Sequence, residues 1–323
     1  MDSQNTQIKL LPDTNAPIAI KLLYQVLSNC QYGSLQLSSD SDTFLVEGDL
    51  PGPDVNITIH NPLKIIRKLS RDGDIGFAEA YMQGDWDTDN LSDFLYWETL
   101  NLETLSAHIE ANRFVQLFNR LRHLTLRNSQ RGSRRNISAH YDLGNDFYQL
   151  WLDSTMTYSS AVFTDENDTL EQAQSQKYEQ LLASLNATPG QHILEVGCGL
   201  GGFAEHAAKQ GYQVTGVTLS TEQLDWATQR IADAGLSYLV DLMLQDYRNI
   251  EDQFDHIVSI EMFEAVGESY WPSFFDTLFA RLKPGGRIAL QTITISHAYF
   301  DQYRQNVDLI QRYIFPGGML PSP

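Results

Sequence analysis

The chain has 323 residues, which is enough for two domains that each bury a core. A formal net charge of -19 excludes a general nucleic-acid binder, because phosphate recognition needs a basic surface. The only cysteines, Cys30 and Cys198, lack metal-ligand spacing, so we expect no metal site and a reducing, cytoplasmic location.

Residues 1–125 predict a small α+β domain. Apolar side chains follow a helical spacing over residues 18–27, and strand alternation is expected at residues 34–37, 43–47 and 55–59. Glycine and proline gather at residues 48–53, which predicts a turn between two of the strands. The remainder predicts helices that are broken at Gly73, Gly76 and Gly84.

A basic linker is assigned to residues 126–137. Arginines concentrate in and just before it: Arg120, Arg122, Arg127, Arg131, Arg134 and Arg135. Such a run forms either a solvated joint or a contact to an anionic surface. In a chain this acidic, it favours docking on an anionic membrane, at about 1 kcal/mol for each arginine. No apolar run approaches the roughly 18 residues that span a bilayer, so the expected contact is peripheral.

Residues 138–323 are assigned to a second domain, in which strand and helix patterns alternate. Strands are expected at residues 192–196, 213–218, 239–244, 254–260 and 287–293, and helices are expected to begin at Gly202, Thr221 and Trp271. This alternation is typical of an α/β fold with a doubly wound, Rossmann-like parallel sheet.

A glycine-rich turn follows the first of these strands, in the order Glu195, Gly197, Gly199 and Gly201. Glycine allows a tight turn and a close approach of the backbone to a ligand. A purely structural turn is the alternative, because many folds share this pattern. The acid at the strand end suits the ammonium group of a methionine moiety and would repel a pyrophosphate. The turn therefore favours S-adenosylmethionine over NAD.

The next two strands also end in polar residues. A ribose-binding group is expected at the end of the second strand, among Thr218, Leu219, Ser220 and Gln223. The end of the third strand suits the edge and face of adenine with Gln245, Asp246 and Tyr247.

Six further segments stand in order along the chain: HYDLGNDFY from His140, MTYS from Met156, GVTLS from Gly216, QDYR from Gln245, MFE from Met262, and IFPGGMLPS from Ile314. Over residues 60–323 the sequence resembles the cyclopropane-fatty-acyl-phospholipid synthase family and the related mycolic acid cyclopropane synthases. This resemblance implies a class I methyltransferase domain that acts on a cis double bond of an unsaturated phospholipid chain and forms a cyclopropane.

The resemblance also assigns residues. The cofactor would be held by Tyr158 and Ser159, together with the strand-end residues above. The reaction passes through a carbocation, which survives only where water is excluded. Its cation–π partners, or else ordinary core residues, are Tyr158, Phe163, Phe263 and Tyr313. His140 is assigned to the catalytic site or, alternatively, to a structural hydrogen bond.

The expected base site departs from the family pattern. Relatives hold a bicarbonate ion as the base, and Glu264 and Ile293 match its ligands. Ser160 replaces a cysteine, Gln291 replaces a histidine, and Glu261 stands where glycine is usual. We expect Glu261 to replace bicarbonate as the proton acceptor, with Ser160 and Gln291 as its partners. The alternative is that Glu261 forms an ion pair or a helix cap while bicarbonate still binds.

The sequence stops at Pro323 inside a family motif, after five expected strands where the fold usually has seven. We therefore expect a C-terminally incomplete domain, and a missing segment or a homodimer partner to cover the edge of the fifth strand. Two alternatives to cyclopropane formation stay open: a fatty-acyl C-methyltransferase that makes methyl-branched or methylene lipids, and a catalytically impaired fragment that binds cofactor or lipid. A small-molecule methyltransferase is a third reading.

Overall fold

The computed structural model describes residues 8–9, 17–39, 42–106 and 144–323. The chain divides into two compact units. The first contains the described residues up to Ser106 together with Asn306–Leu309, and the second contains residues 144–305 together with residues 310–323. The predicted linker, its arginines and His140 lie outside the described residues.

The first unit is a mixed five-stranded sheet with helices. Its strands are β1 (Ile8–Lys9), β2 (Tyr32–Ser38), β3 (Thr43–Glu47), β4 (Leu50–Ile59) and β5 (Trp86–Asp87), in the order β1-β3-β2-β4-β5. Its helices are α1 (Ile18–Leu27), α2 (Pro62–Asp72), α3 (Asp74–Met82), α4 (Leu91–Leu100) and α5 (Leu102–Ser106). Apolar residues of the sheet and of the helices pack into one core, which includes Leu35, Ile57 and Trp97.

Two glycine-based expectations for this unit need correction. The expected turn at residues 48–53 is shorter, because residues 48–49 link β3 to β4 and strand β4 begins at Leu50. A Cβ on Gly52 would lie 2.7 Å from the backbone nitrogen of Gly33, so these glycines let strands approach closely. Gly76 lies inside α3 and breaks no helix. A Cβ there would lie 2.0 Å from the carbonyl oxygen of Lys68, so Gly76 allows α2 and α3 to pack closely.

The second unit confirms the expected doubly wound α/β fold. Its strands are β6 (His192–Val196), β7 (Gln213–Thr218), β8 (Val240–Leu244), β9 (Phe254–Ile260) and β10 (Leu282–Gln291). They are all parallel, in the order β10-β9-β6-β7-β8. Its α-helices are α8 (Asn145–Gln149), α9 (Leu170–Leu185), α10 (Gly202–Lys209), α11 (Thr221–Asp233), α12 (Trp271–Arg281) and α13 (His297–Gln305).

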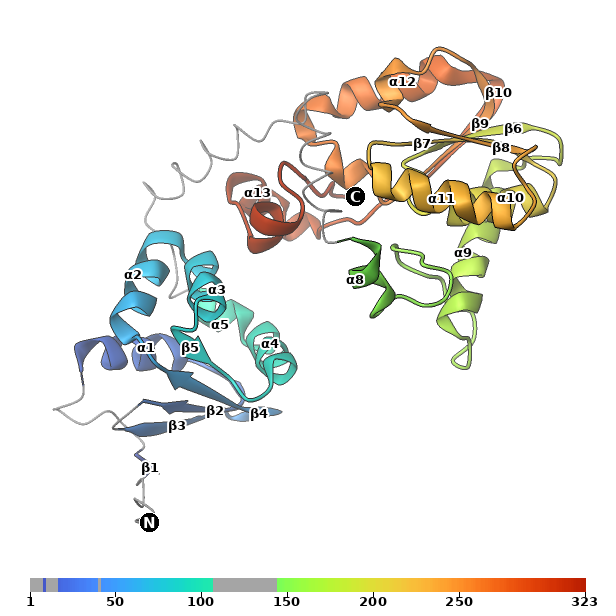
Figure 1. The fold of residues 1–323 in the computed structure, drawn as a ribbon. Coiled ribbons are helices and arrows are strands. Elements are labelled where there is room, and N and C mark those ends of the chain that lie inside the picture. The colour runs from blue at the N-terminus through green and yellow to red at the C-terminus, as the bar shows by residue number, and fades with distance from the viewer. Residues whose placement is uncertain (1–7, 10–16, 40–41, 107–143) are drawn as a thin grey trace. The chain divides into compact units, whose positions relative to one another are not determined.

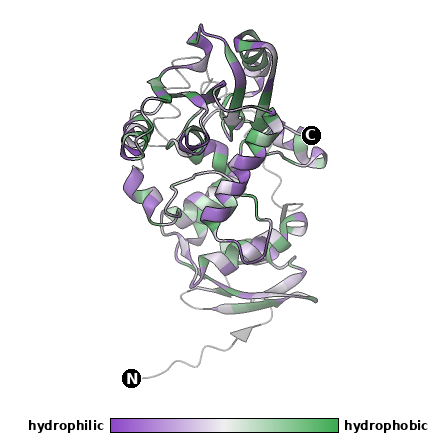
Figure 2. Ribbon diagram, turned by 90° about the vertical axis from the view of Figure 1, so that its right-hand side faces the viewer, coloured by the Kyte–Doolittle hydropathy of each residue, from purple (hydrophilic) through white to green (hydrophobic). Residues whose placement is uncertain are grey.

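Helices cover both faces of this sheet (Figure 1). On β6, Ile193 packs in the cluster beneath α9 and α10, and the next residue, Leu194, packs in the cluster that includes Phe274 of α12. Successive side chains of a strand point to opposite faces, so a strand covered on both sides must be apolar throughout. Hydrophobic and hydrophilic stretches both occur along the helices that cover it (Figure 2).

The fifth strand differs from the expectation in its bounds. It was expected over residues 287–293, but β10 spans Leu282–Gln291. Its pairing with β9 shifts between Leu282 and Arg287, where proline and glycines interrupt the ladder. Among the described residues, no helix is long and apolar enough to cross a membrane.

Candidate active site

A cavity opens at the carboxyl ends of the parallel strands of the second unit. It is lined by residues that follow β6, β7, β8 and β9, by the segment from Met156 to Ser159, and by Phe315, Pro316 and Gly318. Ligands of open α/β sheets bind at this edge, where successive loops diverge from the strand ends. Eleven of the thirteen residues expected to hold the cofactor line the cavity: Tyr158, Ser159, Glu195, Gly197, Gly199, Thr218, Leu219, Gln223, Gln245, Asp246 and Tyr247.

Glu195 is the buried carboxylate of this cavity. Only 2% of the residue is exposed, and its Oε2 atom has no hydrogen-bond partner among the described residues. Burial raises the pKa of the Glu195 carboxyl well above its ordinary value, against the smaller effect of the Lys177 charge. A buried carboxylate oxygen without a partner is costly, and an ammonium group in the cavity would satisfy it.

The turn after β6 makes room beside Glu195. Gly197 and Gly199 have φ angles of +85° and +51°, which favour glycine. A Cβ on Gly199 would meet no atom within 4 Å and would project from the cavity wall. Gly201, in contrast, does not line the cavity. A Cβ there would lie 2.9 Å from Cβ of Ala227, so Gly201 lets α10 pack against α11.

At the ends of β7 and β8, polar side chains bind one another. Thr218 Oγ1 donates to Gln223 Oε1 at 2.8 Å. Ser220 lies outside the cavity lining and caps α11, because its Oγ accepts from the backbone N–H of Gln223. The Asp246 carboxylate accepts from Arg248 Nε at 2.8 Å and from a terminal guanidinium nitrogen at 2.6 Å. Arg248 also lines the cavity and was not predicted from the sequence.

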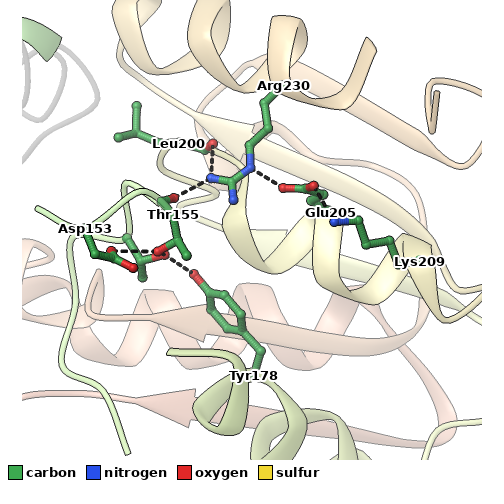
Figure 3. A network of polar contacts seen from close by, with 8 residues as sticks. Asp153, Thr155, Tyr178, Leu200, Glu205, Lys209 and Arg230 are labelled. Atoms are coloured by element: carbon green, nitrogen blue, oxygen red, sulfur yellow. Dashed lines mark hydrogen bonds and ion pairs between the residues drawn. The ribbon is translucent and has the colours of Figure 1, made fainter. Parts of the chain in front are cut away.

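Residues 156–159 line the cavity, and helices hold three residues in or just before this segment, Thr155, Thr157 and Ser159. Figure 3 shows the contact between Thr155 and Arg230. The Thr155 carbonyl accepts from Arg230 of α11 at 2.7 Å, and the Thr157 hydroxyl lies 3.1 Å from that of Tyr178 of α9. Tyr158 lines the cavity next to Thr157.

Three residues of the expected base site form one hydrogen-bonded cluster. Glu261 Oε1 accepts from the Ser160 backbone N–H at 2.8 Å, from Ser160 Oγ at 2.7 Å and from Gln291 Nε2 at 2.9 Å. Gln291 Nε2 also lies 3.0 Å from Ser160 Oγ. Glu261 follows β9 with a φ of +47°, a conformation that favours glycine, and it lines the cavity. The surroundings therefore hold this glutamate in a strained backbone.

Glu264 and Ile293 form a second pair. The Ile293 backbone N–H donates to Glu264 Oε1, and Glu264 Oε2 is buried without a partner among the described residues. Burial raises the pKa of the Glu264 carboxyl, and the nearby Glu261 charge adds a smaller effect in the same direction. The described residues thus place two carboxylates near each other at this end of the site.

The aromatic candidates separate into different environments. Tyr158 lines the cavity, with Tyr148 and Phe315 as further aromatic walls that were not predicted. Phe263 packs in the core against Trp271 and Phe274. Of the other two, Phe163 is 57% exposed and Tyr313 is 47% exposed, and neither lines the cavity. For Phe263 the core-packing alternative holds.

The cavity fits S-adenosylmethionine in two respects. Glu195 offers an unpartnered carboxylate oxygen to the ammonium group, and the Gly199 backbone leaves open space where a side chain would stand. Glu195 lies near the end of β6 and Gly199 lies on the turn that follows, where the cofactors of such sheets bind. The described residues contain no group of three His, Cys, Asp or Glu side chains that could hold a metal ion.

Comparisons with known proteins agree with this geometry. A family model described as mycolic acid cyclopropane synthetase matches residues 128–323. Tuberculostearic acid methyltransferase UfaA1 of Mycobacterium tuberculosis is 37% identical over 97% of this chain and 73% of its own length. The cyclopropane-fatty-acyl-phospholipid synthase of Escherichia coli K12 is 37% identical over 86% of this chain and 69% of its own length.

A solved structure is similar as well. The mycolic acid cyclopropane synthase CmaA1, complexed with SAH and CTAB, has a TM-score of 0.54 and 34% sequence identity to this chain. The match covers 58% of this chain and 70% of that one.

Proposed function

The chain belongs to the mycolic acid cyclopropane synthetase family, and we propose that it converts a cis double bond of a phospholipid acyl chain into a cyclopropane. Membership makes it an S-adenosylmethionine-dependent methyltransferase, with lipid acyl chains as the class of substrate. The phospholipid substrate and the ring product are the proposed part. One observation carries the proposal: a fixed carboxylate, Glu261, lines the same cavity as Glu195, whose Oε2 atom has no partner among the described residues.

The two carboxylates have different tasks in this proposal. S-adenosylmethionine supplies an electrophilic methyl group, which one alkene carbon of the substrate takes while the other becomes a carbocation. Glu195 binds the ammonium end of the cofactor and so orients it. Tyr158, Tyr148 and Phe315 present aromatic surfaces to the cavity and help to exclude water from the cation.

Glu261 is the proposed proton acceptor. Three donors bind its Oε1 atom, which holds the carboxylate in place and leaves Oε2 to take a proton. When that proton leaves the transferred methyl group, the electrons of the broken C–H bond close the ring onto the cationic carbon. A bicarbonate ion beside Glu261 would repel it, and Glu261 already uses the Ser160 and Gln291 donors. We therefore infer that no bicarbonate is needed.

The second candidate product is a methylene or methyl-branched chain. The rebuilt base site favours it, because the product depends on which proton the base removes. Removal of a proton from the new methyl group closes the ring, and removal of one from the acyl chain leaves a methyl-branched alkene. If hydride first shifts from the methylated carbon to the cationic carbon, removal of a methyl proton leaves a methylene chain. The relative at 37% identity that is described as a tuberculostearic acid methyltransferase supports this candidate.

The test uses labelled S-adenosylmethionine and vesicles of a monounsaturated phospholipid, with product analysis by mass spectrometry and fragmentation. We expect label in the acyl chain, and a loss of at least about a hundredfold in Glu261→Gln that bicarbonate does not restore. Both products add one carbon, so fragmentation must locate it. Full activity of Glu261→Gln without bicarbonate would contradict the proposed base. Cofactor binding without transfer would instead indicate a catalytically impaired protein.

A further inference from the structure

Lys177 is a buried lysine for which the reaction above has no task. It lies on α9 and is 1% exposed, on the helix face that also buries Ala173, Tyr178 and Leu182. Lysine is almost never fully buried unless it is paired, because removing an ammonium group from water is costly. An apolar residue would pack on this face at no such cost. The charge therefore needs an explanation.

The direct contacts of Lys177 are with neutral groups. Among the described residues, its Nζ donates to Ser159 Oγ at 2.7 Å and to Gln174 Oε1, and it lies 4.4 Å from the ring centroid of Tyr178. Gln174 Nε2 in turn donates to the Ser159 carbonyl at 2.8 Å. The two polar residues of α9 thus hold both the hydroxyl and the carbonyl of Ser159, which lines the cavity.

The direction of the Ser159 hydrogen bond decides what Ser159 can offer a ligand. An ammonium group has three donors and no acceptor, so Ser159 Oγ must accept from Lys177. The hydroxyl proton of Ser159 then remains available for an acceptor in the cavity. A nearby buried positive charge makes an anionic acceptor the preferred one.

The acidic neighbours of Lys177 include the group assigned above to the ammonium end of the cofactor. Glu261, Glu195 and Asp153 act on it electrostatically, from the segment after β9, from β6 and from the loop before Met156. Glu195 is therefore a charged neighbour of Lys177, and it carries the unpartnered oxygen assigned above to an ammonium group. An α-amino acid presents its ammonium and carboxylate groups on one carbon, so its two binding groups must also be neighbours.

We propose that Lys177 is a positioning residue that acts through Ser159, so that the Ser159 hydroxyl binds the carboxylate of the methionine moiety while Glu195 binds its ammonium group. The inference rests on the proposed cofactor and is independent of which lipid product forms. In this assignment, Glu195 binds the ammonium group of S-adenosylmethionine directly. Lys177 acts on the carboxylate group through the Ser159 hydroxyl.

The test measures binding by calorimetry with two ligands. S-adenosylhomocysteine has the amino-acid group, and methylthioadenosine lacks it. At pH 7 we expect Lys177→Met to weaken S-adenosylhomocysteine about tenfold or more, and methylthioadenosine less than about threefold. The matched control is Lys209→Met on α10, an exposed lysine that pairs with Glu205, and we expect it to change neither affinity. An equal loss for both ligands, or no loss, would overturn the proposal.

Two further measurements separate positioning from packing. If Lys177 acts through Ser159, the double variant with Ser159→Ala should be no weaker than the worse single variant, within about threefold. Burial lowers the pKa of Lys177 to about 8, despite the opposing acidic neighbours, so the ammonium charge is present below that pH and lost above it. The advantage of the wild type over Ser159→Ala in binding S-adenosylhomocysteine should therefore shrink between pH 7 and pH 9.5.

The pH series keeps the proposal testable if Lys177→Met fails to fold, because Ser159→Ala changes one half-buried hydroxyl. A pH-independent advantage of the wild type would count against Lys177. Failure of the proposed function gives a different result: the wild type would bind S-adenosylhomocysteine but transfer no label to the vesicles.

Discussion

Two residues of this protein, Glu261 and Lys177, occupy positions that are unfavourable for their residue type. Glu261 occupies a left-handed backbone position, and Lys177 lies fully buried. Strain and buried charge each cost free energy, so they persist where other contacts compensate for them. For Glu261 those contacts are the Ser160 and Gln291 donors, and for Lys177 they are Ser159 and Gln174.

The base site should be convertible into the family pattern by changing the three residues of its cluster. We expect the combined variant Ser160→Cys, Glu261→Gly and Gln291→His to lose activity in bicarbonate-free buffer and to regain at least about a tenth of it when bicarbonate is added. Glycine suits the φ of +47° at position 261, so this backbone should tolerate the change. The measurement is label transfer against bicarbonate concentration. A variant that stays inactive although folded, or active without bicarbonate, would argue against this account.

At the scale of elements, the turn from β6 to α10 forms part of the cavity wall to which we assign the cofactor. Gly197, Gly199 and Gly201 all have positive φ angles but meet different surroundings. A Cβ on Gly197 would contact the Met262 side chain, and a Cβ on Gly201 would contact Ala227. A Cβ on Gly199 would have no atom within 4 Å. Of these three glycines, only Gly199 therefore faces free space at the cavity wall.

Gly199→Ala should weaken cofactor binding far more than it destabilises the fold. The positive φ costs an alanine about 1 kcal/mol or slightly more, and its methyl group would intrude on the space reserved for the ligand. The matched control is Gly235→Ala, which has a φ of +70° and equally open space, but lies outside the cavity lining. We expect similar losses of unfolding free energy, and a loss of S-adenosylhomocysteine affinity of about tenfold or more in Gly199→Ala alone. Equal affinities would show that the turn does not contact the ligand.

At the scale of the whole molecule, the sequence predicts two opposing effects of charge on binding to an anionic membrane. The net charge of -19 repels an anionic membrane, whereas six arginines lie between residues 120 and 135. These arginines lie outside the described residues, so their role stays a prediction from the sequence.

Replacing Arg131, Arg134 and Arg135 by Gln should weaken binding to anionic vesicles. At about 1 kcal/mol for each arginine near such a surface, the combined loss is on the order of a hundredfold. Sedimentation with anionic vesicles measures it, and zwitterionic vesicles are the control. Added salt should weaken the wild type more than the variant, which keeps three of the six arginines. If salt instead strengthens wild-type binding, repulsion by the acidic body dominates and the docking role is wrong.

The sequence by itself determined which segments of the second unit form strands and helices. The bounds of β6, β7 and β9 and the starts of α10, α11 and α12 agree with the periodicity of their apolar residues. A strand covered on both faces must be apolar over its whole length, and such a local constraint is readable without the fold. The same holds for Glu195 and the glycines, whose spacing points to a ligand at the strand end.

Tertiary structure decided which residues meet. Ser160, Glu261 and Gln291 are separated by up to 131 positions, and their grouping was expected only through the family pattern. Lys177 gave no signal, because a lysine on an amphipathic helix ordinarily faces water, and only packing shows that this one is buried. The prediction for Gly76 is wrong for the same reason. Glycine in a segment alone favours a helix break, but here the absence of a side chain at Gly76 lets α2 pack against α3. Burial and contact are properties of the folded whole, whereas periodicity belongs to each segment alone.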